Sequence, residues 1–475
     1  MTPLGYIMLP VGLAGLFLSR KWLYRFFVFF TLFSASSAAN FGEGDNGSAL
    51  QLWMFFGSLW LLRLVIERLP AFAFSIDRRI LRPCLWLIAF LFVASLSLIM
   101  PVYINGTLAI ASPDLFDGSE TPLFLTSHNL TQLLYLIFGG GIAISVAHSN
   151  LRDEDRHETE RIILLSALFI SVWGLFQFFC NLTGIPYPDY IFNNSGSGSG
   201  KGFLETLNGV GRISSAAVEP SMFAQSLVTL LPLTLPAWLR RGSVLSVSID
   251  RSCTVLFIVV LMLCTSSTAY LGLFILAVLL LPVLLRTRTM SAARALKFAA
   301  MAGTTIVAVI TIAASSIPIV SDVINATLLN KYSAGSGLDR AWSIGLAFGY
   351  FQKFPLLGIG WGSATSHDLI VKLLSNVGLI GTFAFLGAMH CVLRANWHAL
   401  DPLVLPSSLS RAAWFLALAV FLCTSFLITF PLAFGNFWLV LGMAISTGWK
   451  AGPAQTPMLT SKSHNQITPL PVGSD

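Results

Sequence analysis

Residues 162–182 read IILLSALFISVWGLFQFFCNL, a run without a charged side chain. A helix needs about 20 apolar residues to cross the hydrocarbon core of a bilayer, so this stretch is long enough to span a membrane. Further apolar segments follow one another along the chain. Because three of the segments are short, we expect eleven to thirteen spans. The candidates lie at roughly 3–18, 22–39, 49–66, 84–101, 129–147, 162–182, 220–238, 252–265, 269–285, 297–315, 368–390, 412–428 and 435–448.

The composition of the whole chain supports a membrane protein. Its 475 residues are 55% hydrophobic and only 10% charged, and the mean hydropathy is +0.78. Soluble domains carry roughly 25% charged residues, which excludes a water-soluble fold. No ten-residue alternation typical of barrel strands occurs, so we expect helical spans and an all-α polytopic fold. The sequence predicts one transmembrane domain over residues 1–450 and a disordered cytoplasmic tail over 451–475.

The basic residues indicate how the chain is oriented in the membrane and do not indicate a nucleic-acid ligand. The chain has 28 Lys and Arg against 21 Asp and Glu, and most of the basic residues flank apolar segments. Such residues orient a membrane protein, so nucleic acid is not an expected partner. All six cysteines lie in or beside apolar segments without metal-like spacing, and the histidines are scattered. We therefore expect no metal site and no cofactor.

If successive spans cross the membrane in opposite directions, the loops between them alternate between the two sides, and most of the basic residues fall on one side. On this topology 22 Lys and Arg are cytoplasmic and six are outside, as the positive-inside rule requires. Three long loops, at about 102–128, 183–219 and 316–367, then lie on the outer side. We expect the polar machinery in these loops. The six outer basic residues are Lys201, Arg212, Lys331, Arg340, Lys353 and Lys372.

The first candidate site begins near the end of the second long loop, in GRISSAAVEPSMFAQ at 211–225. Arg212 can bind phosphate oxygens with two parallel N–H bonds. Pro220 after Glu219 favours a turn into the following span, because proline is suited to the first helical position. The alternative is that Arg212 and Glu219 form only an interfacial ion pair.

The second candidate site begins in the third long loop and runs from Gly337 to Gly381. Apolar residues at helical spacing over 338–354 predict a helix along the membrane interface, with Arg340 and Lys353 at its ends. Pro355 should end this helix, and the glycines at 358, 360 and 362 permit a tight return to His367.

His367 could accept a proton from a sugar hydroxyl, because its unperturbed pKa is near 6.5. Taken alone, a histidine at such a position is more often an ordinary interfacial residue. Secondary candidates are Lys353, Asp368 and His128. His128 belongs to Ser127-His128-Asn129, which opens a span as Ser366-His367-Asp368 does.

At these positions the sequence resembles the O-antigen ligase and polymerase superfamily, which includes exopolysaccharide repeat-unit polymerases. The similarity covers about 170 residues, from Arg212 to Gly381. In that family an outer-loop arginine precedes a Glu/Asn-Pro segment leading into a span, as Arg212 precedes EPSMFA here. Asp368 stands where Asn or Ser is usual, and Asn376 where an acidic residue is common. The later family pattern of arginine, tryptophan, P-L-L-G-x-G turn, histidine and two glycines matches Arg340, Trp342, 355–360, His367, Gly378 and Gly381.

The resemblance implies a GT-C-like membrane fold and an inverting, metal-independent glycosyl transfer from an undecaprenyl-diphosphate-linked sugar. Arg212 and Arg340 would hold the diphosphate leaving group, and His367 would position or deprotonate the acceptor hydroxyl. Glu219 would be a second base or would orient Arg212, and we favour orientation. The resemblance further implies a multi-pass protein of the bacterial inner membrane whose active site faces the periplasm.

Three functions are compatible with this site. The EPS segment and the sequence around His367 favour a polymerase of O-antigen or exopolysaccharide repeat units. The first alternative is an O-antigen ligase that transfers glycan to lipid A core, and the second is a flippase or transporter of lipid-linked oligosaccharide. Expected partners are the undecaprenyl-diphosphate-linked oligosaccharide, membrane lipid, and the chain-length regulator and flippase of the same pathway.

Overall fold

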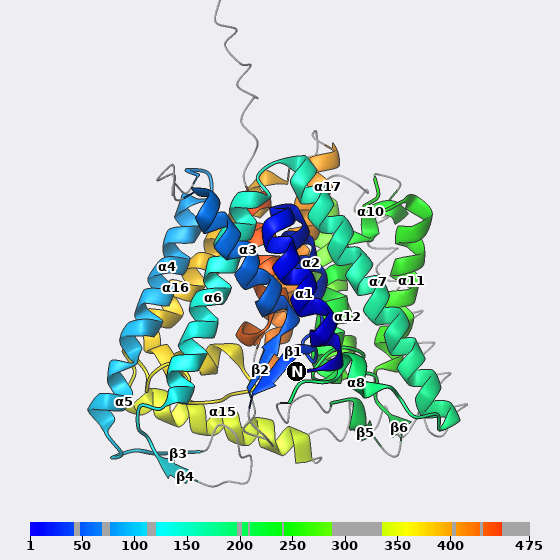
Figure 1. Ribbon diagram of the computed structural model, residues 1–475. Coiled ribbons are helices and arrows are strands. Elements are labelled where there is room, and N and C mark those ends of the chain that lie inside the picture. Colours follow the sequence, from blue (N-terminus) through cyan, green and yellow to red (C-terminus); the bar gives the residue numbers. More distant parts are fainter. Residues whose placement is uncertain are drawn as a thin grey trace, which may run out of the picture.

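The computed structural model is a bundle of helices that run between two ends (Figure 1). It is 75% helical with little sheet, and within the part of the chain that the structure describes five helices are long and apolar enough to cross a membrane, which is consistent with an all-α membrane protein. These five are Leu81–Ile104 (α4 and α5), Ser127–Ser149 (α6), Asp153–Thr183 (α7), Ser267–Arg286 (α12) and Leu369–Ala399 (α16). The expected total of eleven to thirteen spans stays a prediction. The structure describes residues 1–41, 48–68, 77–111, 120–196, 202–207, 210–239, 242–286, 335–400, 405–427 and 431–448.

Shorter helices complete the bundle. Helix α18 is only 13 residues long, yet it lies in the centre of the bundle, as the burial of almost all of its side chains shows. Close approach to α6 is possible because Gly139 faces the buried indole of Trp438, where a β-carbon would clash. The shorter helices are Pro3–Leu18 (α1), Arg20–Phe30 (α2), Leu52–Arg68 (α3), Pro220–Leu230 (α9), Val247–Leu263 (α11), Leu405–Thr424 (α17) and Gly435–Thr447 (α18).

Two of the expected helices are wrong in part. The helix expected over 22–39 ends at Phe30, and Ser37–Phe41 forms strand β1, paired antiparallel with Ser48–Gln51 (β2). Small polar side chains explain why the helix ends at Phe30. The Ser36 hydroxyl, for example, donates to the Phe192 carbonyl at 2.6 Å, a contact outside any helix of its own segment. The helix expected over 220–238 is broken by prolines that lack an N–H. Its pieces are α9, the 3-10 turn Leu231–Leu233 (η4) and Leu235–Trp238 (α10).

Other boundaries differ by extension. Helix α7 begins at Asp153 rather than near 162, because acidic residues in a first turn favour a helix N-terminus. The interfacial helix expected over 338–354 is present as Gly335–Lys353 (α15) and ends before Pro355, as predicted. The span expected at 297–315 and the tail at 451–475 lie outside the described residues.

The described parts of all three long loops meet at one end of the bundle, at the bottom of Figure 1. Helix α15 lies across this end, beside short elements that the sequence did not predict. We call this the α15 end, and the other the α10 end. The short elements are Ile99–Ile104 (α5), Asp189–Phe192 (α8), and the hairpins of Ala109–Ala111 with Glu120–Pro122 (β3, β4) and Thr206–Leu207 with Val210–Gly211 (β5, β6).

Candidate functional site

Arg212 is held at the α15 end by a side chain from the neighbouring helix α7. The buried amide of Gln177 donates to the Arg212 carbonyl at 3.2 Å and accepts from the backbone N–H groups of Ser214 and Ser215, at 3.1 and 2.7 Å. The Ser215 hydroxyl donates to the Ile170 carbonyl at 2.6 Å. One helix therefore supplies the bonds that place Arg212.

The side-chain partner of Arg212 is Glu205, on the opposite side of the small β5–β6 hairpin. The Arg212 Nη1 lies 2.6 Å from the Glu205 Oε2, and the Arg212 backbone N–H donates to the Glu205 carbonyl at 2.9 Å. Glu219, which we expected to orient Arg212, has a different bond, since its Oε2 accepts from the Ser221 hydroxyl at 2.9 Å. The described geometry thus gives the orienting contact to Glu205.

Glu219 stands immediately before helix α9. Pro220 is the first residue of that helix, as predicted, and the Glu219 carbonyl accepts the N–H groups of Met222 and Phe223 at 3.1 Å each. The Glu219 side chain does not cap the helix. Its carboxylate is partly exposed, so the position can present a negative charge to a neighbouring cation.

Arg340 and His367 are connected through a serine between them. The Ser343 hydroxyl donates to the Arg340 carbonyl at 3.0 Å, and its oxygen lies 2.9 Å from the His367 Nδ1. When the one hydroxyl proton points to this carbonyl, which can only accept, the Nδ1 carries the proton of the second bond. A neutral His367 therefore has its lone pair on Nε2.

Four charged side chains act on one another at this end. Burial lowers the pKa of Arg340, while the charges of Glu219 and Glu205 raise it and that of Arg212 lowers it. Burial likewise raises the pKa of Glu205, which the nearby Arg212 and Arg340 lower. The structure therefore brings Arg212, Glu219 and Arg340 together as the sequence predicted and adds Glu205 to them.

The same environment keeps His367 neutral. Burial, with the positive charges of Arg340 and Lys372, lowers its pKa to about 4. At neutral pH the imidazole is therefore unprotonated and can accept a hydrogen bond at Nε2. A pKa so low makes it a weak base until a negative charge arrives nearby.

Two glycines explain how the chain reaches His367. The turn after α15 pairs with a kink in α16, since the Ile359 N–H donates to the Ser375 carbonyl at 2.8 Å and the Leu379 N–H to the Pro355 carbonyl at 2.8 Å. Gly358 and Gly378 have φ of +66° and +64°, and a β-carbon on Gly378 would lie 2.2 Å from a backbone oxygen. Both positions require glycine because backbones touch there.

Asn376 completes this turn. Its fully buried side chain accepts from the N–H groups of Ser363 and Ala364, at 3.1 and 3.2 Å, and donates to the carbonyls of Ala364 and Lys372, at 2.9 and 2.8 Å. A carboxylate could not make the two donations, so an amide suits this position better than an acid.

The secondary candidates lie around this centre in different roles. Lys353 is exposed at the far end of α15, roughly 20 Å along the helix from Arg340 at 1.5 Å per residue. Asp368 caps α16 by accepting the Val371 N–H at 2.8 Å. His128 stands next to Asn129, which donates to the Trp361 carbonyl at 2.9 Å and so forms part of the wall behind the turn.

Sequence reasoning missed Glu205 and Ser343. Ser343 could have been found, since it lies three residues after Arg340 and so on the same helix face. No local sequence pattern pointed to Glu205, because only the pairing of the two-residue strands β5 and β6 brings it next to Arg212. Among the residues that the structure describes, no three His, Cys, Asp or Glu side chains gather to hold a metal ion.

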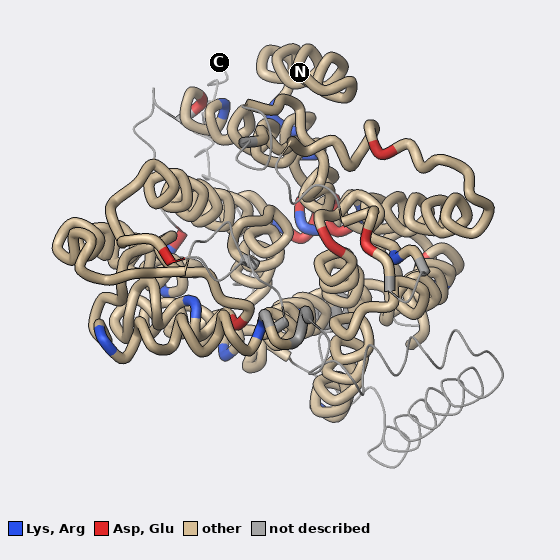
Figure 2. Tube along the Cα trace, turned by 90° about the horizontal axis from the view of Figure 1, so that it is seen from below, with Lys and Arg blue, Asp and Glu red and all other residues tan. Residues whose placement is uncertain are grey.

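Seen from the α15 end, most of the chain carries no charge, and acidic and basic positions occur near the middle of the bundle (Figure 2). The arrangement can bind an anion between two arginines beside a neutral imidazole. In comparisons with known proteins, no family model and no curated protein matches the chain.

Proposed function

We propose that this chain is a glycosyltransferase of the O-antigen ligase and polymerase superfamily. It polymerises undecaprenyl-diphosphate-linked oligosaccharide repeat units at the periplasmic face of a bacterial inner membrane. The α15 end of the bundle is then the periplasmic end. The resemblance between Arg212 and Gly381 supports the family, and the charged cluster supports the chemistry.

One observation carries the proposal: both arginines keep N–H groups without a partner. The Nε and Nη1 of Arg340 and the Nε of Arg212 are buried and find no hydrogen-bond acceptor among the described residues. A buried donor left unpaired costs about 1–3 kcal/mol, and more when it is charged. Such a cost is explained if an anionic ligand completes the site, and a diphosphate offers the oxygens that guanidinium groups bind best.

The reaction follows from this placement. The acceptor hydroxyl oxygen attacks the anomeric carbon from the face opposite the diphosphate and forms the new glycosidic bond. The bond between the anomeric carbon and the phosphate oxygen breaks, and its electron pair leaves with undecaprenyl diphosphate. Arg212 and Arg340 stabilise the negative charge that develops on this leaving group.

His367 receives the proton of the acceptor hydroxyl at Nε2. Ser343 holds the proton on Nδ1 and thereby keeps the lone pair on the correct nitrogen. When the negatively charged diphosphate binds next to Arg340, it raises the pKa of His367 and strengthens the base in the loaded enzyme. Substrate binding and base strength are thus coupled.

Polymerase and ligase share this donor chemistry and differ in the acceptor. The EPS segment at 219–221 favours the polymerase. A flippase is the other candidate. It is less well supported, because a transport path does not require a neutral histidine with an oriented lone pair beside the two arginines.

The test is reconstitution of the purified full chain in liposomes with lipid-linked repeat units, followed by sizing of the glycan. We expect a ladder of products in the absence of any other enzyme. Transfer onto added lipid A core without a ladder would identify a ligase. Movement of the lipid-linked donor across sealed vesicles without a new glycosidic bond would contradict the glycosyltransferase.

A further inference from the structure

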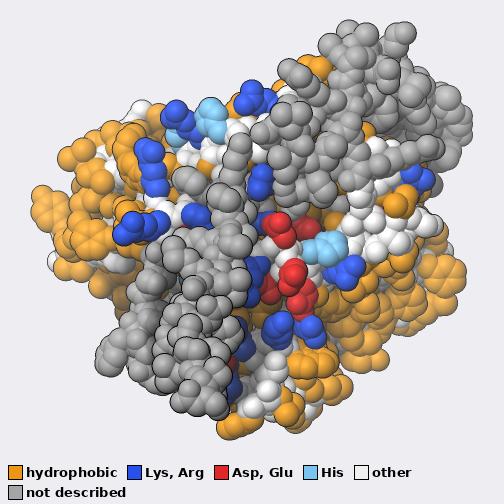
Figure 3. All heavy atoms as spheres, turned by 90° about the horizontal axis from the view of Figure 1, so that it is seen from above, with side chains coloured by type: hydrophobic (Ala, Val, Ile, Leu, Met, Phe, Trp, Pro, Cys, Tyr) orange, Lys and Arg blue, Asp and Glu red, His pale blue; other side chains and the backbone are white. Residues whose placement is uncertain are grey.

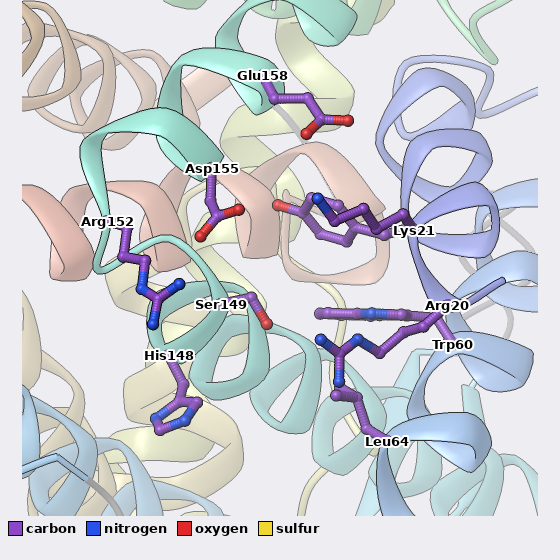
Figure 4. A pocket seen from close by; sticks show the side chains of 10 residues that line it. Arg20, Lys21, Trp60, Leu64, His148, Ser149, Arg152, Asp155 and Glu158 are labelled. Atoms are coloured by element: carbon purple, nitrogen blue, oxygen red, sulfur yellow. The ribbon is translucent and has the colours of Figure 1, made fainter. Parts of the chain in front are cut away.

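A polar cavity lies at the α10 end of the bundle, away from the proposed active site. Its volume is about 290 Å³, and it opens between the start of α2, the end of α6 and the start of α7. Figure 4 shows the side chains of Lys21, Arg152 and Asp155 turned toward the same space, with the Ser149 hydroxyl beside it. We call this the Lys21 pocket.

The charges of the Lys21 pocket are unevenly paired. Its lining includes three cations, Arg20, Lys21 and Arg152, and two carboxylates, Asp155 and Glu158. Arg20 is paired with Glu67 at 2.6 Å, and Arg25 outside the pocket neutralises Glu158 at 2.6 Å.

Lys21 and Arg152, by contrast, form no ion pair within the described part of the chain. The pocket therefore presents two available cations and, beside them, the single carboxylate of Asp155.

The position of the pocket is that of a membrane interface. Ser149 ends α6 and Asp153 begins α7, and both helices are long enough to span a bilayer. The neighbouring end of α1 exposes Phe17 and Leu18, which are 81% and 77% accessible. An apolar surface of this kind beside a cationic pocket suits a molecule with a charged headgroup and acyl chains.

We propose that the Lys21 pocket binds the headgroup of a membrane phospholipid. Lys21 and Arg152 hold its phosphodiester, and Asp155 accepts a hydrogen bond from the far end of the headgroup. Basic pockets between membrane helices are suited to such headgroups. The carboxylate favours a headgroup that can donate, either the ammonium of phosphatidylethanolamine or the hydroxyls of phosphatidylglycerol. Phosphatidylcholine has no such donor.

The test is native mass spectrometry of the purified full chain in detergent, titrated with each of these three lipids. We expect phosphatidylethanolamine and phosphatidylglycerol to bind more tightly than phosphatidylcholine. Lys21→Ala and Arg152→Ala should each weaken binding about fivefold, the effect of one basic residue near a membrane surface. Arg82→Ala, which removes an exposed arginine at the same end but outside the pocket, should stay within about twofold.

Two further arms identify the ligand. Asp155→Asn should weaken binding of phosphatidylethanolamine alone if the carboxylate meets an ammonium, and a loss with neither lipid would contradict its role. Glycerophosphoethanolamine, which has no acyl chains, should bind far more weakly than the intact lipid; equal binding would mean a soluble phosphodiester and would overturn the lipid assignment. A Lys21→Ala/Arg152→Ala double variant that binds lipid as tightly as the wild type would also overturn the proposal. None of these outcomes depends on glycosyl transfer.

Discussion

The two ends of the bundle use charge in different ways. At the α15 end a few charged side chains are partly buried, and the Arg212 side chain is 22% exposed. At the α10 end many Lys and Arg lie on the surface (Figure 3), and the Arg20 and Arg25 side chains are 45% and 44% exposed, although Arg156 and Arg411 are buried there. Both ends contain ion pairs of nearly equal length, so distance alone does not separate them.

The difference lies in desolvation. An exposed ion pair contributes about 0–1 kcal/mol, because water and salt screen it. A partly buried arginine with unpaired N–H groups is costly to keep, and a ligand can repay that cost. Exposed cations are suited to orienting a membrane protein, whereas Arg212 and Arg340 indicate a binding site because both keep buried, unpaired N–H groups and lie close enough for their charges to interact. The Lys21 pocket lies between these extremes.

Removing a buried cation should have the largest effect. On the proposed function, we expect Arg340→Ala in the reconstituted protein to lower the rate of chain elongation by about 100-fold or more, because it removes a positive charge from beside the leaving group. Arg25→Ala, the matched change at the α10 end, should leave the rate within about twofold. Rates are normalised to the amount of folded protein in the membrane. Equal losses in both variants would remove the distinction between the two ends.

The buried histidine should shift the pH profile. The proposed reaction requires the neutral imidazole, so activity should persist above the pKa of His367 and fall about tenfold per pH unit below it. Because that pKa is about 4, the acid limb of kcat/KM should lie near pH 4 instead of near 6.5. In kcat the limb should lie higher, since bound diphosphate raises the pKa. A kcat/KM limb near pH 6.5 that persists in His367→Gln would belong to another group.

Weakening the pairing of Arg212 should have the smallest effect. In the proposed mechanism the Glu205 carboxylate would compete with the substrate diphosphate for this side chain, so Glu205→Gln should lower KM by about two- to fivefold, the range of a partly exposed ion pair. Glu67→Gln, which removes the ion pairs of Glu67 with Arg20 and Arg63 at the α10 end, is the control and should leave KM unchanged. A higher KM in Glu205→Gln would show that Glu205 assists binding.

Local sequence signals predicted several parts of this molecule well. The apolar run at 162–182 lies within the helix α7, and the spacing over 338–354 forms α15, which ends before Pro355. Pro220 begins α9 and the glycines after 355 form the return. These features depend on segment length, side-chain periodicity and backbone freedom, which act over a few neighbouring residues.

Other parts depended on contacts that no local pattern contains. The end of α2 at Phe30 follows from polar bonds to a distant loop, and the central place of the short helix α18 follows from packing against α6. The sequence overestimated the helical content of 22–39 because small residues such as Ser and Ala are acceptable both in a span and in a strand.

The sequence by itself determined that the chain is helical and membrane-embedded, and it placed Arg212, Arg340 and His367 in loops of one predicted side. The tertiary structure alone decided how these residues pair, with Glu205 instead of Glu219 on Arg212 and with Ser343, 24 residues away, on His367. Helix formation is set by neighbours along the chain. The proton position on an imidazole and the partner of a guanidinium are set by whichever side chains packing brings within hydrogen-bond distance.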